Sequence, residues 1–403
     1  MTLITSTTQF LTNYSFIDLA TYNSLVSSGA TVLLACENEE GFLTYREVDI
    51  ELTIHSGKII NLNGKSCKQF ALTIAGDLYG TNDPKITNLK HPKLEFQFYA
   101  RQFTNIPFDN FDKNTSYMGK TYTNGVESVG KYYLQRIGKK FGIENPESNP
   151  RMDYFFLFVG FTIKHGRISA STKLQFSGTD SYLKNILTEL KIKYVLGTNG
   201  KDCTIKSEAY NNEFSKLVNL SQQSSTRKFP TWAYFMNSRN ANNILNGYAK
   251  LPVDTYGEIT TSNINLGTIN SLTQLSIHAS ATCYTLNTKK ANSIKNYENK
   301  EAVINKTIST KKYEALSPEQ KALYQPNYNT PEYRLRIFRC SEKLTNRPKQ
   351  YYKNFTPYFN PEDMSILDFN GEMVHIKFDD GFKFFVRCQL DDETYGIPFL
   401  VGN

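Results

Sequence analysis

The sequence predicts a mixed fold: an all-β unit formed by both chain ends, interrupted by an α+β unit that contains two similar repeats. Residues 1–118 and 368–401 alternate polar with apolar or aromatic residues in short runs bounded by Gly, Asn and Asp, a pattern typical of strands and turns. In residues 182–190 the apolar spacing becomes helical, after the N-cap candidates Asp180 and Ser181. A similar order of helices and strands then recurs, which predicts pseudo-two-fold symmetry.

The composition is that of a folded protein with a basic excess. The chain has 403 residues, and at about 150 residues per domain this corresponds to two or three domains. Its 39% hydrophobic and 21% charged residues exclude a disordered or rod-like chain. The longest apolar run, Tyr154 to Phe161, is far shorter than the roughly 20 residues of a membrane span, so no membrane association is expected. The net charge of +8 favours polyanionic partners such as nucleic acid.

Several kinds of site are excluded by their missing motifs. The six cysteines stand singly and no two of the five histidines lie within one helical turn, which excludes a structural zinc site and a HExxH metalloprotease. Nucleotide-binding and α/β-hydrolase functions lack their motifs, since neither GxGxxG, GxxxxGK[ST] nor GxSxG occurs. Scattered cysteines without an export signal predict a reducing, cytoplasmic location.

These patterns divide the chain into four segments. Residues 1–118 form the first part of the β unit, with runs such as Phe42-Leu-Thr-Tyr-Arg-Glu-Val48. Residues 119–150 are a linker or basic extension that is rich in Lys, Gly and Asn. Residues 151–322 form the α+β unit, and residues 323–403 complete the β unit.

Each repeat of the α+β unit is predicted to begin with a helix. The first opens with Phe156-Leu-Phe-Val-Gly-Phe-Thr-Ile-Lys-His-Gly-Arg-Ile168 and continues through the helix after Asp180. The second opens with Ile244-Leu-Asn-Gly-Tyr-Ala-Lys-Leu251, and a helix over 266–277 and a strand over 281–286 follow. We expect the two opening helices to pair, and each repeat to contribute a small twisted sheet to a saddle that lies in DNA.

At these residues the sequence resembles the LAGLIDADG homing endonucleases, in the double-motif form found within inteins. Two further segments resemble the intein endonucleases of phages: Arg227-Lys-Phe-Pro-Thr-Trp232 and Leu275-Ser-Ile-His-Ala279. In that family each opening helix ends in an acidic residue, and the two carboxylates bind the Mg²⁺ ions that cut DNA. The resemblance places these acids at His165 and Pro252, neither of which can replace a carboxylate. Asp254 and Asp153 are the remaining candidates.

The flanking segments, 1–118 and 323–403, resemble the Hint splicing fold of inteins. The early strands of that fold are similar to Thr2-Leu-Ile-Thr5, Gly41-Phe-Leu-Thr-Tyr-Arg-Glu-Val48 and Gly57-Lys-Ile-Ile60. Its last strands are similar to Phe369-Asn-Gly-Glu-Met-Val-His-Ile-Lys-Phe378 and Val401-Gly-Asn403.

The Hint resemblance implies three splicing groups, and none is expected to work here. Met1 stands where the family has a Cys or Ser nucleophile, and Gly76 stands where its TxxH motif has the histidine. Asn403 matches the asparagine that cyclises, but no residue follows it in the sequence for it to release. We therefore interpret these residues as relics and expect no self-splicing.

Basic residues supply the candidate DNA contacts. Several of them share a stretch with aromatic residues or lie on strands predicted to face DNA, where Lys and Arg contact phosphates and guanine edges. The candidates are Lys131, Arg136, Lys139, Lys140, Arg167, Lys173, Lys289 and Lys290. The Lys-rich segment 285–321 is consistent with either a basic arm on DNA or a linker.

The sequence therefore favours a freestanding, degenerate relative of an intein-borne homing endonuclease that binds double-stranded DNA without splicing or cutting it. One alternative is an active Mg²⁺-dependent endonuclease, the one case in which a cofactor is expected. Another is a domesticated scaffold subunit of a phage particle or viral complex, which the 26 Tyr and 27 Phe would suit. We expect a monomer with internal pseudo-symmetry, in the cytoplasm of an infected bacterium or in a virion, with a viral protein as a further partner.

Overall fold

The structure is a computed structural model, and it describes most of the chain. The described residues are 2–4, 8–64, 67–72, 78–81, 104–105, 116–119, 123, 125, 131–169, 171–197, 202–218, 220, 227–263, 265–287, 302–303, 306–307, 317–318, 333–339, 358–359, 364–377, 382–387, 395–396 and 398–402.

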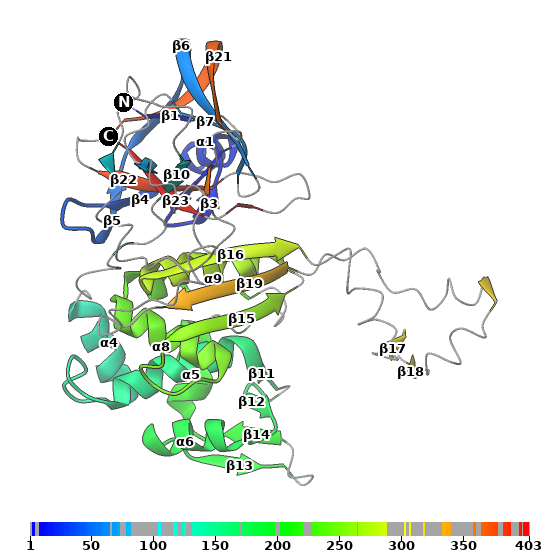
Figure 1. Cartoon of the computed structure of the whole chain (residues 1–403). Coiled ribbons are helices and arrows are strands. Elements are labelled where there is room, and N and C mark those ends of the chain that lie inside the picture. The colour runs from blue at the N-terminus through cyan, green and yellow to red at the C-terminus, as the bar shows by residue number, and fades with distance from the viewer. Residues whose placement is uncertain are drawn as a thin grey trace.

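The β unit consists of antiparallel sheets (Figure 1). One sheet has the order β1-β21-β6-β7, with β1 (Thr2–Ile4), β6 (Asp49–Gly64), β7 (Cys67–Leu72) and β21 (Met364–Lys377). A second has the order β23-β22-β2-β4-β5, with β3 beside β2; its strands are β2 (Gln9–Thr12), β3 (Ser15–Ile17), β4 (Leu33–Glu37), β5 (Leu43–Glu47), β22 (Lys383–Arg387) and β23 (Phe399–Gly402). A third has the order β20-β10-β8-β9, with β8 (Leu78–Thr81), β9 (Thr104–Asn105), β10 (Ser116–Gly119) and β20 (Tyr358–Phe359).

Strands from the two chain ends share these sheets. Leu3 pairs with His375, and Phe10 pairs with Val386. The short helix α1 (Leu19–Ser27) begins where the Asp18 side chain accepts a hydrogen bond from the backbone N–H of Thr21. Strands β1 and β23, nearest the two chain ends, both lie in the upper part of Figure 1.

The middle unit begins with helices that enclose a large apolar core. Its first repeat contains α5 (Arg151–His165), β11 (Gly166–Ile168), β12 (Leu174–Ser177), α6 (Ser181–Glu189), β13 (Tyr194–Leu196), β14 (Asp202–Ile205), the π-helical turn η2 (Ala209–Phe214) and α7 (Ser215–Leu217). The sheet order is β11-β12-β14-β13. As predicted, α6 follows the N-cap Asp180 and buries Leu183, Ile186 and Leu187.

The second repeat has the same topology over three strands. It contains the 3₁₀ turn η3 (Thr231–Phe235), α8 (Ser238–Ala249), β15 (Gly257–Asn263), α9 (Leu266–His278), β16 (Ala281–Asn287) and β19 (Tyr333–Arg339). Its sheet order is β15-β19-β16, so the last strand in sequence lies between the other two, as β14 lies between β12 and β13. A separate short pair is formed by β17 (Ala302–Val303) and β18 (Lys306–Thr307).

Two predicted segment boundaries are corrected by these pairings. Strand β19 falls within 323–403, which was predicted to belong to the β unit, yet it pairs along its whole length with β15 and β16. Helix α4 (Lys131–Phe141) falls within the predicted linker 119–150, yet it buries Leu134, Ile137 and Phe141 in the core of the middle unit. The predicted mixed fold, with helices and several antiparallel sheets, is confirmed.

Helix α9 connects the two units. The buried guanidinium of Arg387 on β22 donates to the side-chain oxygens of Gln9 and, across the boundary, Asn270 of α9. About two turns further along α9, the hydroxyl of Tyr45 on β5 lies 2.7 Å from Nε2 of the buried His278. The units thus meet through a buried polar network rather than through an apolar contact alone.

Candidate nucleic-acid interface

Helices α5 and α8 cross at two glycines that contact the opposite backbone. A Cβ added to Gly160 would lie 1.9 Å from the carbonyl oxygen of Ile244, and one added to Gly247 would lie 1.9 Å from that of Leu157. Leu157 and Ile244 each stand three residues before their own glycine, so the contact is reciprocal. Only glycine leaves room for such a close approach of two backbones. The crossing therefore has approximate two-fold symmetry.

The two helices run in the same direction. Near their first turns, Asp153 of α5 accepts hydrogen bonds from Arg239 (2.9 Å) and Asn243 (3.2 Å) of α8. At their other ends, the ammonium group of Lys164 lies over the ring of Tyr248. Each helix is followed by its own antiparallel sheet, so the pair places the two sheets on either side of one axis (Figure 1).

The first turns of the helices bring together the two candidate acids, Asp153 and Asp254. After Lys250 the chain turns back along α8, and Asp254 reaches Arg239 (2.9 Å). Arg239 therefore forms ion pairs with both carboxylates. Burial raises the pKa of Asp153, and the charge of Arg239 opposes this shift.

This arrangement does not favour a magnesium site. Arg239 and Asn243 already donate to both acids, so a cation occupies the position between the carboxylates that a metal ion would need. No group of three or more His, Cys, Asp or Glu side chains suited to a metal occurs among the residues that the structure describes. Arg239 was missed by the sequence analysis because its contacts depend on the chain reversal after α8.

The other end of the helix pair holds the two motif positions, His165 and Pro252. His165 is half-buried, and its Nε2 has no hydrogen-bond partner among the residues that the structure describes. Burial, followed by the charges of Lys250 and Lys164, lowers its pKa to about 4, so the ring is neutral near pH 7. Pro252 is exposed beyond the end of α8. Neither position supplies a carboxylate, and the charges of Lys164 and Lys250 lie near His165.

The sheet of the first repeat presents a row of three polar side chains and one apolar side chain on its exposed side. Arg167, Gln175, Thr204 and Val195 lie in register across β11, β12, β14 and β13. Arg167 is exposed and forms an ion pair with Asp202 (2.8 Å). The alternate residues of β12, Leu174 and Phe176, are buried in the core. Both candidate DNA contacts of this region, Arg167 and Lys173, are exposed.

The sheet of the second repeat carries two arginines that the sequence analysis did not select. Arg334 and Arg336 of β19 alternate with the fully buried Leu335 and Ile337. They pair in register with Ser262 and Thr260, both exposed on β15. Arg336 also forms an ion pair with Glu258. The alternation in Tyr333-Arg-Leu-Arg-Ile-Phe-Arg339 predicts a strand, but the predicted segment 323–403 places it in the other unit.

The remaining predicted residues divide into two groups. On α4, Arg136, Lys139 and Lys140 are exposed, and Lys140 forms an ion pair with Glu213 of η2. Lys131 opens the same helix. Outside the described residues lie Lys289, Lys290, Met1, Gly76 and Asn403.

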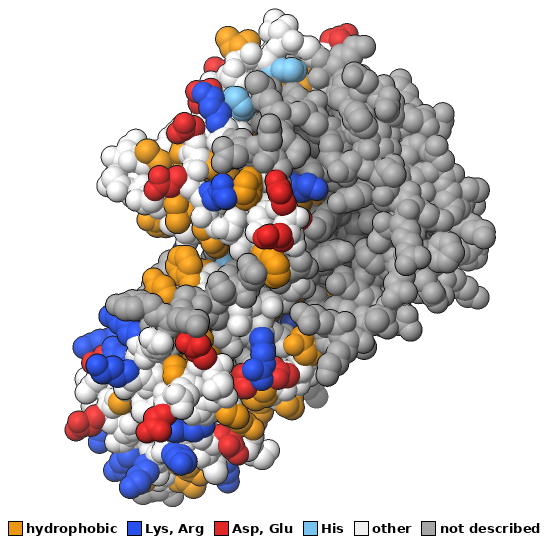
Figure 2. All heavy atoms as spheres, turned by 90° about the vertical axis from the view of Figure 1, so that its left-hand side faces the viewer, with side chains coloured by type: hydrophobic (Ala, Val, Ile, Leu, Met, Phe, Trp, Pro, Cys, Tyr) orange, Lys and Arg blue, Asp and Glu red, His pale blue; other side chains and the backbone are white. Residues whose placement is uncertain are grey.

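On the face shown in Figure 2, Lys and Arg side chains gather over the lower part of the molecule, which is the middle unit. Asp and Glu side chains lie between them. The charge of this face is therefore mixed. It supports DNA binding less strongly than the arginines on the strands do.

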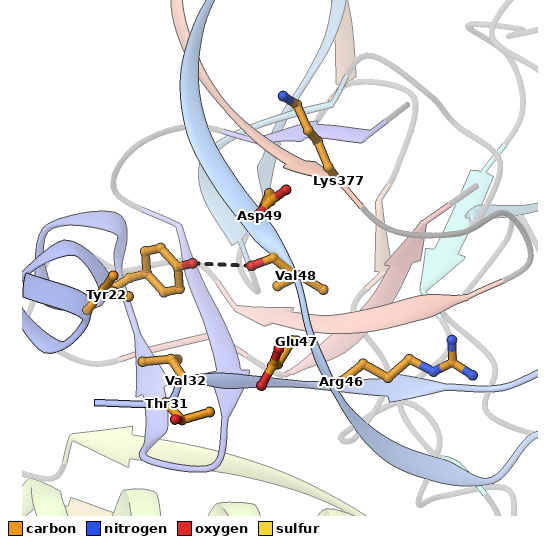
Figure 3. A pocket seen from close by; sticks show the side chains of 9 residues that line it. Tyr22, Thr31, Val32, Arg46, Glu47, Val48, Asp49 and Lys377 are labelled. Carbon is orange, nitrogen blue, oxygen red and sulfur yellow. Dashed lines mark hydrogen bonds between the residues drawn. The ribbon is translucent and has the colours of Figure 1, made fainter. Parts of the chain in front are cut away.

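A cavity of about 410 Å³ lies in the β unit, apart from the helix pair (Figure 3). The hydroxyl of Tyr22 donates to the carbonyl oxygen of Val48 at one side of it. Acids and bases both line it: Arg46, Glu47, Asp49 and Lys377. Because charges of both signs alternate there, they do not define one class of ligand.

Comparison with known proteins adds no family. No model of a known protein family matches the chain, and no curated protein matches it either. Within the described ranges, no helix is both long and apolar enough to cross a membrane.

Proposed function

We propose that the protein binds double-stranded DNA through the exposed faces of the two sheets beside α5 and α8, as a degenerate relative of intein-borne LAGLIDADG homing endonucleases. The observation that carries this proposal is the reciprocal contact of Gly160 and Gly247. It joins two repeats of like topology around one axis, and a duplex has matching two-fold symmetry. The Hint-like character of the β unit belongs to the same proposal and is supported by sheets that combine both chain ends.

The strand arginines would supply the DNA contacts. Arg167 on one sheet and Arg334 and Arg336 on the other alternate with buried residues, so they point away from the core. Arg side chains bind phosphates and the O6 and N7 atoms of guanine. The neutral side chains beside them, such as Gln175 and Thr260, would add hydrogen bonds to base edges.

Cleavage is not part of the proposed function. Asp153 and Asp254 are bound by Arg239, and the motif positions hold His165 and Pro252. An active endonuclease needs carboxylates free to coordinate Mg²⁺. DNA binding is accordingly expected without added metal.

Gel-shift and cleavage assays on the genomic DNA that flanks the gene, with and without Mg²⁺, test this proposal. The double variant Arg334→Gln/Arg336→Gln should weaken the shift. The matched control Lys377→Gln removes a half-exposed charge of the β unit and should leave it unchanged. A metal-independent shift without cutting supports the proposal. Mg²⁺-dependent cutting, or no shift at all, contradicts it.

A scaffold role in a viral complex is a second candidate, which one observation favours. Ile54 and Leu52, on the long ribbon of β6 and β21, are 76% and 48% exposed. The ribbon stands out at the top of Figure 1. Exposed apolar side chains on such an element suit a protein partner. Loss of binding to a viral protein on Ile54→Ser, with DNA binding retained, would support this role.

A further inference from the structure

Positive charge converges at the joint end of α5 and α8. Lys164 lies in the last turn of α5, and Lys250 directly follows α8. The ammonium group of Lys164 is 4.7 Å from the ring centre of Tyr248 on α8. That of Lys250 is 5.5 Å from the ring centre of Phe161 on α5. Each lysine therefore reaches over the opposite helix.

Capping of the helix ends does not account for these lysines. Cations near a helix C-terminus ordinarily compensate its dipole and its free carbonyl groups. Here the buried guanidinium of Arg227 donates to the carbonyl oxygens of Ile163 (3.2 Å) and Gly166 (2.5 Å) at the end of α5. After α8, the hydroxyl of Tyr182 donates to the carbonyl oxygen of Leu251 (2.8 Å). The carbonyl oxygens of Ile163, Gly166 and Leu251 are thus bound by donors other than these two lysines.

The cluster has too few acids to balance its bases. Asp180 binds Lys250 at 2.7 Å. Within the described part of the chain, no acidic side chain forms an ion pair with Lys164. Burial, and then the charge of Lys250, lower the pKa of Lys164, which indicates that the two ammonium groups repel each other. A bound anion would relieve this repulsion. The neutral ring of His165 lies near them, and its Nε2 has no hydrogen-bond partner in the described ranges.

We propose that Lys164 and Lys250 bind a phosphate group between the ends of α5 and α8. Neighbouring ammonium groups from two elements can bind different oxygens of one tetrahedral oxyanion, and the N–H of the neutral His165 ring can donate a further hydrogen bond. Where the phosphate belongs to DNA, the inference deepens the proposed function and rests on it. A free phosphate is the other source of the same chemistry.

Two variants remove one charge each with little strain. Lys164→Met keeps an apolar stem over Tyr248. Lys250→Gly suits the left-handed backbone at this position, where φ is +59°. Lys191→Gly is the matched control, because Lys191 is exposed, follows α6 and has a φ of +57°. Circular dichroism melting of the full-length chain checks that each variant is folded. If Lys164→Met does not fold, Lys250→Gly alone tests the phosphate site.

Two probes are used. Binding of inorganic phosphate is measured by titration calorimetry, and binding of a random-sequence duplex is measured across a salt series. Each variant should weaken phosphate binding by about tenfold, and Lys191→Gly should not. For a duplex phosphate, each lysine removed should make the slope of log K against log salt shallower by about 1.

The outcomes separate this site from the proposed function. A shallower duplex slope in both variants supports a DNA phosphate, whether or not inorganic phosphate alone binds. Phosphate binding that depends on both lysines, with no duplex binding, supports the site and overturns the DNA proposal. If wild-type protein shows no saturable phosphate binding and all four proteins have the same duplex slope, the phosphate site is overturned.

Discussion

Gly160 and Gly247 occupy equivalent places at the crossing of α5 and α8, where each lies against a backbone carbonyl of the other helix. The relation explains why two segments with different sequences can act as one framework. Aromatic side chains fill the space around α5, while asparagines line the buried side of α8. The feature common to both helices is a glycine at the crossing, three residues after the carbonyl group that the other helix contacts. The arrangement of the two helices depends on this feature.

Alanine at either crossing glycine should separate the helices. The new Cβ would lie 1.9 Å from a backbone carbonyl oxygen, and backbone cannot move aside as a side chain can. We expect Gly247→Ala to lower the free energy of unfolding by about 3 kcal/mol or more. Urea denaturation measures this. Gly267→Ala is the control, because the atoms nearest to its Cβ would be side-chain atoms of Asn265 and Lys228. Equal effects of the two substitutions would contradict the account of the crossing.

Removal of Arg239 should leave a buried carboxylate without its cation. Asp153 is 7% exposed, and among the described contacts of its side chain it would keep the hydrogen bond from Asn243. We expect Arg239→Met to cost about 2 kcal/mol of stability. Much of this loss should be recovered in Arg239→Met/Asp153→Asn, since the carboxylate is then neutral. If the double variant is as unstable as the sum of the single variants, the ion pair does not have this role.

The contact between the units should weaken in acid. Burial lowers the pKa of His278 to about 3, whereas in the unfolded chain it is about 6.5. Below about pH 6.5 the unfolded chain therefore binds a proton that the folded chain does not. Stability should fall with pH by up to about 1.4 kcal/mol per unit until the pH nears the folded value.

The variant His278→Gln isolates this effect. Glutamine can still accept a hydrogen bond from Tyr45 but does not titrate. Urea denaturation of both proteins from neutral pH to about pH 5 should show the shallower decline for the variant. Parallel declines would mean that His278 is not the group responsible.

Arg387 should be irreplaceable by lysine. Its Nε and Nη2 both donate to Gln9, its Nη1 donates to Asn270, and its guanidinium lies 4.2 Å from the ring centre of Phe16. Lysine has neither the fork nor the flat face for these contacts. We expect Arg387→Lys to destabilise the chain by about 3 kcal/mol, as measured by denaturant unfolding. Wild-type stability of Arg387→Lys would show that the fork geometry is dispensable.

Local patterns predicted the elements well, and long-range placement less well. Helix α9 and strand β16 follow their predicted bounds within one residue, because spacing and caps are local signals. The alternation in β19 identified a strand, but alternation says nothing about which sheet it joins. In α4 the apolar residues Leu134, Ile137 and Phe141 have helical spacing, yet the lysines around them suggested a linker.

The candidate site was predictable only in part. Asp153 and Asp254 were selected as candidates, and they do lie together. Their pairing with Arg239 depends on the backbone of Lys250, whose left-handed conformation is unusual for lysine and reverses the chain. Such a reversal leaves no clear signal in the sequence.

The salt dependence of duplex binding tests the central claim most directly. Equilibrium affinity for a duplex should fall steeply with salt, because DNA binding by Lys and Arg releases counterions. The variant Arg334→Gln/Arg336→Gln should make the slope of log K against log salt shallower by about 2. A protein without measurable duplex affinity at low salt, or a double variant with the wild-type slope, would contradict binding through the two sheets.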